Sequence, residues 1–365
     1  MSSGNVTSNE LAYERWIPLA KQIVRQSLGL HWKDVLEIYS YVNTIPIAEA
    51  LAVEGRRVGS DTHITLMTDD LWFTSMRELP ARWLRMPSQV EIAINRAITG
   101  YVYLGGPADA RRMREIPTEK FDANAIGNIR QDEPRHLRRV KHVDLPIGRI
   151  CIERAEAYSL DYESWQRSYQ AALDVDLKEI RMAGKAWYRR LTGKRYVNIT
   201  SDAGTNLRFK TKAQEPMLDD GIISSKDLEH GFIETSLPAG KIVSTVLGDS
   251  VQGEIHFTDR VFLMGRSVSG VHLRFEEGRL VKWEAGEHGE LLNSLFQKRI
   301  SGRLQLGWFS IGLNPAAKPC MLDNSVVLNN VGIGFGSHPL LERSKAKPSL
   351  QFDATIGLAK VEILN

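Results

Sequence analysis

The sequence has little cysteine and no long hydrophobic run. Its two cysteines, Cys151 and Cys320, lie far apart and form no CxxC pair, which argues against a disulfide scaffold and indicates a reducing compartment. No stretch approaches the roughly 20 apolar residues that are needed to cross a bilayer. The polar residues 1–10 also lack the apolar core of a signal peptide. We therefore expect a cytoplasmic protein that does not bind membranes.

Several common motifs are absent as well. No GxGxxG follows the first apolar run, and neither GxxxxGK[ST] nor the nucleophile elbow GxSxG occurs. These absences argue against nucleotide binding and against a serine hydrolase of the α/β-hydrolase type. The formal net charge is only +3 over 365 residues, so no bias toward nucleic acid follows. A chain of this length is typical of two domains.

Short apolar runs alternate with helical patterns in the first half of the chain. This alternation predicts βαβ units and a parallel sheet, so we expect an α/β domain over residues 11–195, after a disordered tail at 1–10. The expected strands are 35–39, 63–67 and 100–105, and the expected helices are 11–28, 45–52 and 88–97.

A basic, irregular segment follows at residues 106–148. Acidic residues are interleaved with its cations, which is typical of a solvated surface on a long connection. The alternative is a patch for an acidic peptide or a carboxylate, because the planar guanidinium group binds carboxylates through paired hydrogen bonds. The cations are Arg111, Arg112, Arg114, Arg130, Arg135, Arg138, Arg139 and Lys141.

One long helix is expected over residues 160–191, with Ser159 as its N-cap. Large apolar side chains recur along it at helical spacing. Such a stripe is more typical of a buried core than of a ligand site. It consists of Tyr162, Trp165, Tyr169, Leu173, Leu177, Ile180 and Trp187.

Beyond Gly193 the pattern changes to short β-type runs separated by Gly, Asp and Asn. We therefore expect an antiparallel β domain over residues 196–365, built as a sandwich or a barrel. One helix, at about 286–299, interrupts it. The expected strands are 196–200, 207–210, 241–246, 254–257, 260–264, 270–275 and 279–284.

Five short motifs occur in this half in a recognisable order. They are GTNLRF at 204–209, LPAGKI at 237–242, GWFSIGLN at 307–314, GIGFG at 332–336 and QFD at 351–353. Their order and spacing resemble the thermophilic metallo-aminopeptidase family, of the aminopeptidase T and S type. The resemblance is clearest over residues 196–360 and looser before them. It implies the same combination of an α/β domain with an antiparallel β domain that carries the active-site cleft.

The resemblance also implies where metal ligands would stand, and nearly all of them are replaced. Two ligand glutamates correspond to Lys241 and Trp308, and a ligand histidine corresponds to Gly332. A carboxylate corresponds to Asn324, and the closing HxD motif to Gln351 and Asp353, so only Asp353 keeps ligand chemistry. One carboxylate cannot hold a catalytic metal pair. A lysine ammonium 4 Å from a cation would add repulsion of about 4 kcal/mol at an effective dielectric near 20.

We therefore expect no metal at the inherited positions, no cofactor and no metallo-aminopeptidase activity. The resemblance implies a peptide-binding pseudoenzyme and a homodimer. By analogy, such a pseudoenzyme is similar to the accessory proteins that present a precursor peptide in ribosomal-peptide (RiPP) biosynthesis of the crocagin type. The expected peptide-binding residues are Lys241, Trp308, Asn314, Gly332, Gly334, Gln351 and Asp353.

Two alternatives stay open. The first is an enzyme with metal-independent chemistry, a hydrolase or cyclase of a peptide-derived substrate. Its candidate catalytic groups are His338, Lys241 and Asp353. Lys241 and Asp353 are also expected to form an ion pair across the former active-site cleft. The second is a new metal site. Glu254 and His256 share one face of an expected strand, and His272 lies on a neighbouring one. Two histidines and a carboxylate can form a facial triad, although exposed positions on half-buried strands are the more typical explanation.

Overall fold

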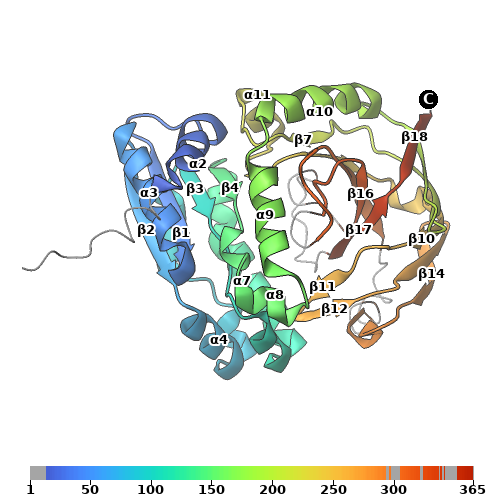
Figure 1. Ribbon diagram of the computed structural model, residues 1–365, viewed down its shortest axis with the longest axis horizontal. Coiled ribbons are helices and arrows are strands. Elements are labelled where there is room, and N and C mark those ends of the chain that lie inside the picture. Colours follow the sequence, from blue (N-terminus) through green and yellow to red (C-terminus); the bar gives the residue numbers. More distant parts are fainter. Residues whose placement is uncertain are drawn as a thin grey trace, which may run out of the picture. The chain divides into compact units, whose positions relative to one another are not determined.

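The computed structural model describes residues 14–292, 296, 305–320, 324–336, 338, 341 and 352–364 (Figure 1). The chain forms two compact units. The first comprises the chain up to Arg154 together with Ile222–Leu237, and the second comprises Ala155–Gly221 together with Pro238–Asn365. The tail expected at 1–10 lies outside the described residues.

This division differs from the boundary expected at residue 195. Helix α10 (Leu177–Leu191) packs on strand β7 (Met217–Asp219) of the second unit: a Cβ atom added at Gly184 would lie 2.2 Å from Cδ1 of Leu218. Strand β8 (Glu234–Ser236), in contrast, pairs with the sheet of the first unit. Sequence patterns indicate local structure. The packing of α10 on β7 and the pairing of β8 with the first unit's sheet both join segments that are distant in the chain.

The first unit contains the predicted parallel sheet. Its strand order is β2-β1-β3-β4-β8, and every neighbouring pair is parallel. Apolar side chains such as Leu36, Ile38 and Val102 are fully buried in it, as a sheet covered on both faces requires. The remaining strands are β1 (Val35–Tyr41), β2 (Asp61–Met67), β3 (Gly100–Tyr103) and β4 (Lys141–Asp144).

Helices connect these strands, and short polar residues begin two of them. Thr68 caps α4 by accepting from the backbone N–H of Leu71, and Ser88 caps α6 by accepting from that of Glu91. The helices are α2 (Ile17–Gln22), the π-helix η1 (Ile23–Ser27), α3 (Ile45–Arg57), α4 (Asp69–Glu78), α5 (Ala81–Leu84), α6 (Gln89–Ala97), α7 (Thr118–Leu137), α8 (Ile152–Ala157) and α11 (Ser225–His230), with 3-10 turns η2 (Val42–Thr44), η3 (Ala110–Glu115) and η4 (Ile147–Arg149). No helix in the described part of the chain is both long enough and apolar enough to cross a membrane.

The expectation of an irregular segment at 106–148 is wrong. Residues 118–137 form α7, a helix of 20 residues, and β4 follows it. The helix was hard to recognise because Pro134 lies inside it and only Ala123, Gly127 and Arg135 are buried along its length. Such a narrow buried stripe produces little apolar periodicity.

The single helix expected at 160–191 is two helices. Asp161 caps α9 (Tyr162–Leu173), and Asp176 caps α10. Ser159 is not an N-cap; it adopts the left-handed conformation, with φ of 54°, just beyond α8. The core interpretation of the stripe fits the structure, since Trp165, Tyr169, Leu173, Leu177 and Ile180 are buried.

The second unit contains antiparallel sheets, as predicted. A six-stranded sheet has the order β14-β13-β10-β6-β5-β18, a five-stranded sheet has the order β17-β16-β15-β9-β7, and β11 pairs with β12. The strands are β5 (Tyr196–Thr200), β6 (Asn206–Lys210), β9 (Lys241–Thr245), β10 (Gln252–His256), β11 (Val261–Leu263), β12 (Arg266–Val268), β13 (His272–Glu276), β14 (Arg279–Glu284), β15 (Leu306–Gly312), β16 (Asn330–Phe335), β17 (Phe352–Leu358) and β18 (Lys360–Leu364). The helix expected at 286–299 falls partly outside the described residues; within them, residues 289–292 and 296 are helical.

An aromatic core lies between the two larger sheets. Phe209 of β6 contacts Phe309 of β15 with ring centroids 5.1 Å apart, and Phe275 of β13 stacks on Phe335 of β16 at 6.2 Å. Side chains alternate along a strand. Trp308 therefore points from the five-stranded sheet away from this core, and His272 points away from it on the six-stranded sheet.

Candidate functional site

The face of the five-stranded sheet turned away from the aromatic core carries most of the expected site residues. Trp308 pairs with Gly334, which in turn pairs with Asp353, and these three positions form one row across the strands. Lys241 pairs with Gly312, at the other end of β15. The sheet register therefore separates the expected residues into two groups.

Lys241 forms an ion pair with Asp219, which the sequence analysis did not identify. The two residues are direct partners in the β7–β9 ladder, and Nζ lies 3.8 Å from Oδ2. The Asp219 side chain is 2% exposed and that of Lys241 is 24% exposed. A cation therefore stands at the position where the resemblance implies a ligand glutamate, and an internal carboxylate neutralises it.

The expected ion pair between Lys241 and Asp353 is wrong. Their strands are three steps apart in the sheet, and the row of Asp353 crosses β15 four residues from the partner of Lys241. With strands about 4.8 Å apart and residues about 3.3 Å apart, the two backbones are roughly 20 Å from each other. The side chain of Asp353 and the whole of Gln351 lie outside the described residues.

Trp308 is half-buried and lies directly on Gly334. A Cβ atom added to this glycine would come within 1.8 Å of the indole. The ring of His338 meets the indole edge to face, with centroids 5.1 Å apart. The indole Nε1 is buried and makes no hydrogen bond with any described residue. Trp308, Gly334 and His338 together form an aromatic platform.

Gly332 and Gly334 do not offer open backbone to a ligand. They lie in β16, which pairs with β15 on one side and β17 on the other, so addition of a peptide strand at this position is excluded. Their missing side chains make room for groups of the protein itself: a Cβ atom at Gly332 would lie 2.4 Å from Oγ of Ser310. Gly332 and Gly334 therefore have no free backbone groups with which to pair with an extended peptide.

Asn314 is structural rather than ligand-binding. Its side chain is fully buried, and Nδ2 donates to the carbonyl oxygens of Ala172 and Ala239, each at 2.9 Å. Its Oδ1 accepts from the backbone N–H groups of Ala316 and Ala317. With both donors and both lone pairs engaged, the amide has no capacity left for a ligand.

The candidates for metal-independent catalysis do not converge. His338 lies against Trp308, whereas Lys241 lies at the other end of the same strand pair, about 13 Å away along the strands. Asn324, at the position of a ligand carboxylate, accepts a hydrogen bond from the backbone N–H of Cys320 at 2.6 Å.

The basic residues of 111–141 are largely engaged inside the first unit. Arg138 donates to the carbonyl oxygens of Arg96 and Ile98 at the C-terminus of α6, and Arg139 donates to that of Leu228. Arg135 is buried, pairs with Asp132 and lies over the ring of Tyr101. These contacts favour the structural explanation over a patch for an acidic ligand.

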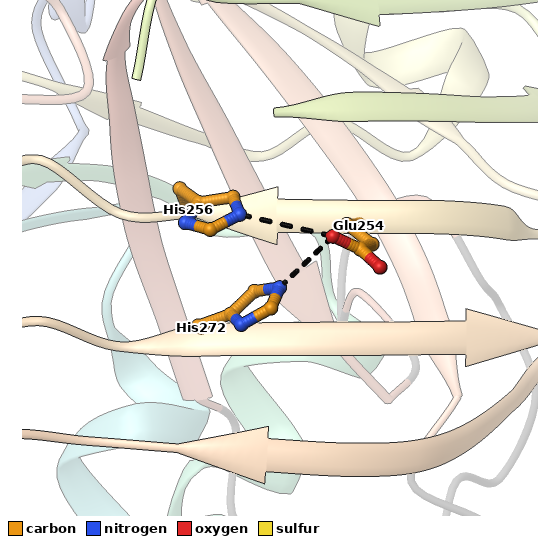
Figure 2. Close-up of side chains that lie close together, drawn as sticks. All are labelled: Glu254, His256 and His272. Carbon is orange, nitrogen blue, oxygen red and sulfur yellow. Dashed lines mark ion pairs between the residues drawn. The ribbon is translucent and has the colours of Figure 1, made fainter. Parts of the chain in front are cut away.

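A different cluster does converge on the outer face of the six-stranded sheet: Glu254, His256 and His272 (Figure 2). Their candidate ligand atoms all lie within 4.8 Å of one another. The two imidazole rings stack with centroids 3.9 Å apart. Burial and the neighbouring His272 lower the pKa of His256 below its ordinary value. This arrangement can offer two imidazoles and a carboxylate to one cation.

A sequence profile of the family described as thermophilic metalloprotease (M29) matches residues 176–317. The matched stretch contains both Lys241 and Trp308, and it ends before β16 and β17. A search of curated protein sequences finds no match.

Two solved structures share the fold. Wild-type AmpT from Thermus thermophilus is 17% identical, matches 96% of each chain and has a TM-score of 0.73. The 2,5-dihydroxypyridine dioxygenase from Pseudomonas putida KT2440 is 11% identical, with 98% of this chain and 94% of that chain covered and a TM-score of 0.58. The fold of this chain is thus aminopeptidase-like: a parallel α/β sheet combined with antiparallel sheets, as in AmpT.

Proposed function

We propose that this protein is a peptide-binding relative of the metallo-aminopeptidases that has lost the inherited metal site. The observation that carries the proposal is the placement of Trp308. A half-buried indole, backed by Gly334 and flanked by His338, occupies the position where the resemblance implies a ligand glutamate.

Two further contacts oppose a metal at the inherited positions. The Lys241 ammonium is held beside Asp219, so a positive charge is fixed where the resemblance implies a carboxylate. Ser310 Oγ fills the space beside Gly332, where the resemblance implies a histidine. Replacing single residues would therefore not restore a ligand set, since the surrounding packing has changed as well.

The aromatic platform suits a peptide side chain. Aromatic residues supply large contact areas at interfaces, and a fixed indole loses little side-chain entropy on binding. Because β16 has no free edge, side-chain contacts rather than strand addition would recognise the peptide. We infer that an apolar or aromatic side chain of the peptide packs on Trp308.

The physiological role that follows is that of an accessory protein presenting a precursor peptide to modifying enzymes, as in RiPP biosynthesis. This role extends the resemblance to peptide-cleaving relatives: a fold that once held a peptide for cleavage would hold one for modification by another protein. Turnover by this chain itself is not required.

Fluorescence anisotropy with a labelled random-sequence peptide pool, followed by resynthesis of the enriched sequences, tests the proposal. We expect Trp308→Ala to weaken the binding free energy by more than about 1 kcal/mol, the usual threshold of an interface hot spot. Its melting temperature should change little. Trp83→Ala, which removes an indole that is 51% exposed in the first unit, is the matched control and should bind normally.

A large loss of stability would instead show that Trp308 fills space in the fold and does not contact a ligand. In that case Trp308→Ala would lose about 3–5 kcal/mol of folding stability, as large-to-small core substitutions do. A destabilised variant with unaltered peptide affinity, or a wild type without enriched sequences, would overturn the proposal.

A further inference from the structure

We propose that Glu254, His256 and His272 form a binding site for one divalent transition-metal ion, of the Zn²⁺ or Fe²⁺ type. The site lies on the six-stranded sheet and is separate from the positions that the family resemblance implies: those that the structure describes lie outside that sheet. It therefore goes beyond the proposed peptide binding and does not depend on it.

The sheet itself brings the three residues together. Glu254 and His256 are two residues apart on β10, so their side chains share a face, and His272 of β13 is the direct cross-strand partner of His256. The opposite face of the same strands is apolar core, where Ile255 and Leu273 are fully buried. The ligand positions therefore stand on a rigid support.

The distances fit a metal site that needs only small side-chain adjustments. Oε2 of Glu254 lies 3.3 Å from Nε2 of His272 and 3.9 Å from Nε2 of His256 (Figure 2). Two ligands bound tetrahedrally at about 2.1 Å are separated by about 3.4 Å. Two histidines and one carboxylate are the donor set of facial-triad sites, which leave further coordination positions open.

The hydrogen bonding of His272 is also compatible with a bound ion. Nε2 of His272 is buried, yet it makes no hydrogen bond with any described residue although the Glu254 carboxylate is close. Buried polar atoms are rarely left unsatisfied in proteins. A metal ion at the centre of the cluster would bind this nitrogen and join all three side chains.

The surroundings also resemble those of metal ligands. Oε2 of Glu284 on β14 lies 3.8 Å from Nδ1 of His272, and a small side-chain movement would let this carboxylate accept a hydrogen bond from a metal-bound imidazole and orient it. Thr205 Oγ1 accepts from the backbone N–H of His256 at 2.9 Å and donates to its carbonyl oxygen at 3.2 Å, which fixes the end of β10.

One competitor for the carboxylate is present. Arg274 Nε lies 3.9 Å from Oε1 of Glu254, but the guanidinium is held more closely by Glu276, at 3.0 Å from Nη2. Arg274 thus approaches the oxygen that faces away from the histidines. Oε2 stays directed toward both imidazoles and is available to a cation.

Titration of the chelator-treated full-length protein with Co²⁺ tests the site. We expect d–d absorption that saturates at one ion per chain and is abolished by competing Zn²⁺. His256→Ala, His272→Ala and Glu254→Gln should each weaken Co²⁺ binding at least about 100-fold, and Glu284→Gln about 10-fold, as expected of a residue that orients a ligand. His31→Ala, which removes an exposed histidine from the first unit, should bind normally.

A second measurement covers variants that fail to fold. On the wild type, diethyl pyrocarbonate modification mapped by mass spectrometry should be suppressed by Zn²⁺ at His256 and His272 but not at His31. Absence of saturable Co²⁺ binding, or equal Zn²⁺ protection of all three histidines, would overturn the proposal. Neither result would bear on peptide binding at Trp308.

Discussion

Asp219 and Lys241 face each other as partners on adjacent strands, with Oδ2 3.8 Å from Nζ. This relationship accounts for how the chain accommodates a lysine where the family resemblance implies a metal-binding glutamate. The carboxylate, that of Asp219, lies on the neighbouring strand. The positive charge beside it is the Lys241 ammonium group and not a bound metal ion. A divalent ion at the same place would meet an ammonium group in place of a carboxylate ligand.

The coupling between Asp219 and Lys241 can be measured by a double-mutant cycle. We expect Asp219→Asn and Lys241→Met to show an interaction free energy of about 1–2 kcal/mol, because one partner is 2% exposed and the pair is only partly solvated. Chemical denaturation of the four proteins provides the measurement.

The exposed pair Lys360 and Glu362 is the control for this cycle. Its side chains are 73% and 42% exposed, and surface pairs of this kind couple only weakly because solvent screens them. Equal coupling for the two pairs would mean that Lys241 is effectively solvated and that Asp219 does not fix its position.

Asn314 should be critical for stability and not for binding. Asn314→Ala would leave two buried carbonyl groups and two backbone N–H groups without their partner. The expected loss is about 3–5 kcal/mol of unfolding free energy. Asn206→Ala, at an exposed strand position, should cost less than about 0.5 kcal/mol. A stable Asn314→Ala protein with impaired peptide affinity would return Asn314 to the list of binding residues.

The first unit contains a carboxyl group that should make stability depend on pH. Glu37 is fully buried in β1, accepts a hydrogen bond from Thr65 at 2.8 Å, and has its pKa raised by burial to about 7. The folded state therefore retains a proton that the unfolded state has already released, and the difference applies between about pH 4.5 and 7.

Stability should consequently fall as the pH rises from about 4.5 to 7 and level off above the folded pKa. The contribution of Glu37 is about 3 kcal/mol across this window. Glu37→Gln should remove it, so the variant becomes the more stable protein near pH 7.5 while the two converge near pH 4.5. Urea unfolding across this range tests the sign; Glu49→Gln, on an exposed position of α3, should leave the wild-type slope unchanged.

Local sequence patterns predicted much of the fold and less of the site. Strand β5 agrees residue for residue with the expected 196–200, and β14 with 279–284, because alternation and flanking turn residues are local signals. The Glu254–His256–His272 cluster could be anticipated for two reasons. Side chains alternate along β10, and β10 pairs with β13, a strand that lies close to it in the chain. The partnership of Asp219 with Lys241 could not be anticipated, since register between strands distant in the chain is set by tertiary packing.

The wrong assignments around the inherited site also arise from tertiary packing that local sequence patterns do not indicate. The motif order indicated which residues replace the metal ligands, but it contained no information on what would fill the vacated space. Ser310 beside Gly332 and the indole of Trp308 on Gly334 are contacts between strands. Asn314 looked like a site residue because it closes a glycine-rich motif, whereas its four hydrogen bonds show why that position needs an amide.

The last prediction concerns catalysis. We expect no hydrolysis of leucine p-nitroanilide, with or without added Co²⁺ or Zn²⁺, because water activation and carbonyl polarisation in this enzyme class require a metal that several ligands hold in place. Lys241→Glu combined with Trp308→Glu should not restore activity, since Gly332 still supplies no imidazole and Ser310 occupies its space. Each preparation should be assayed beside Asp353→Asn. Metal-dependent turnover that this substitution abolishes would show that the inherited site still works, and turnover abolished only by His272→Ala would instead place it on the six-stranded sheet.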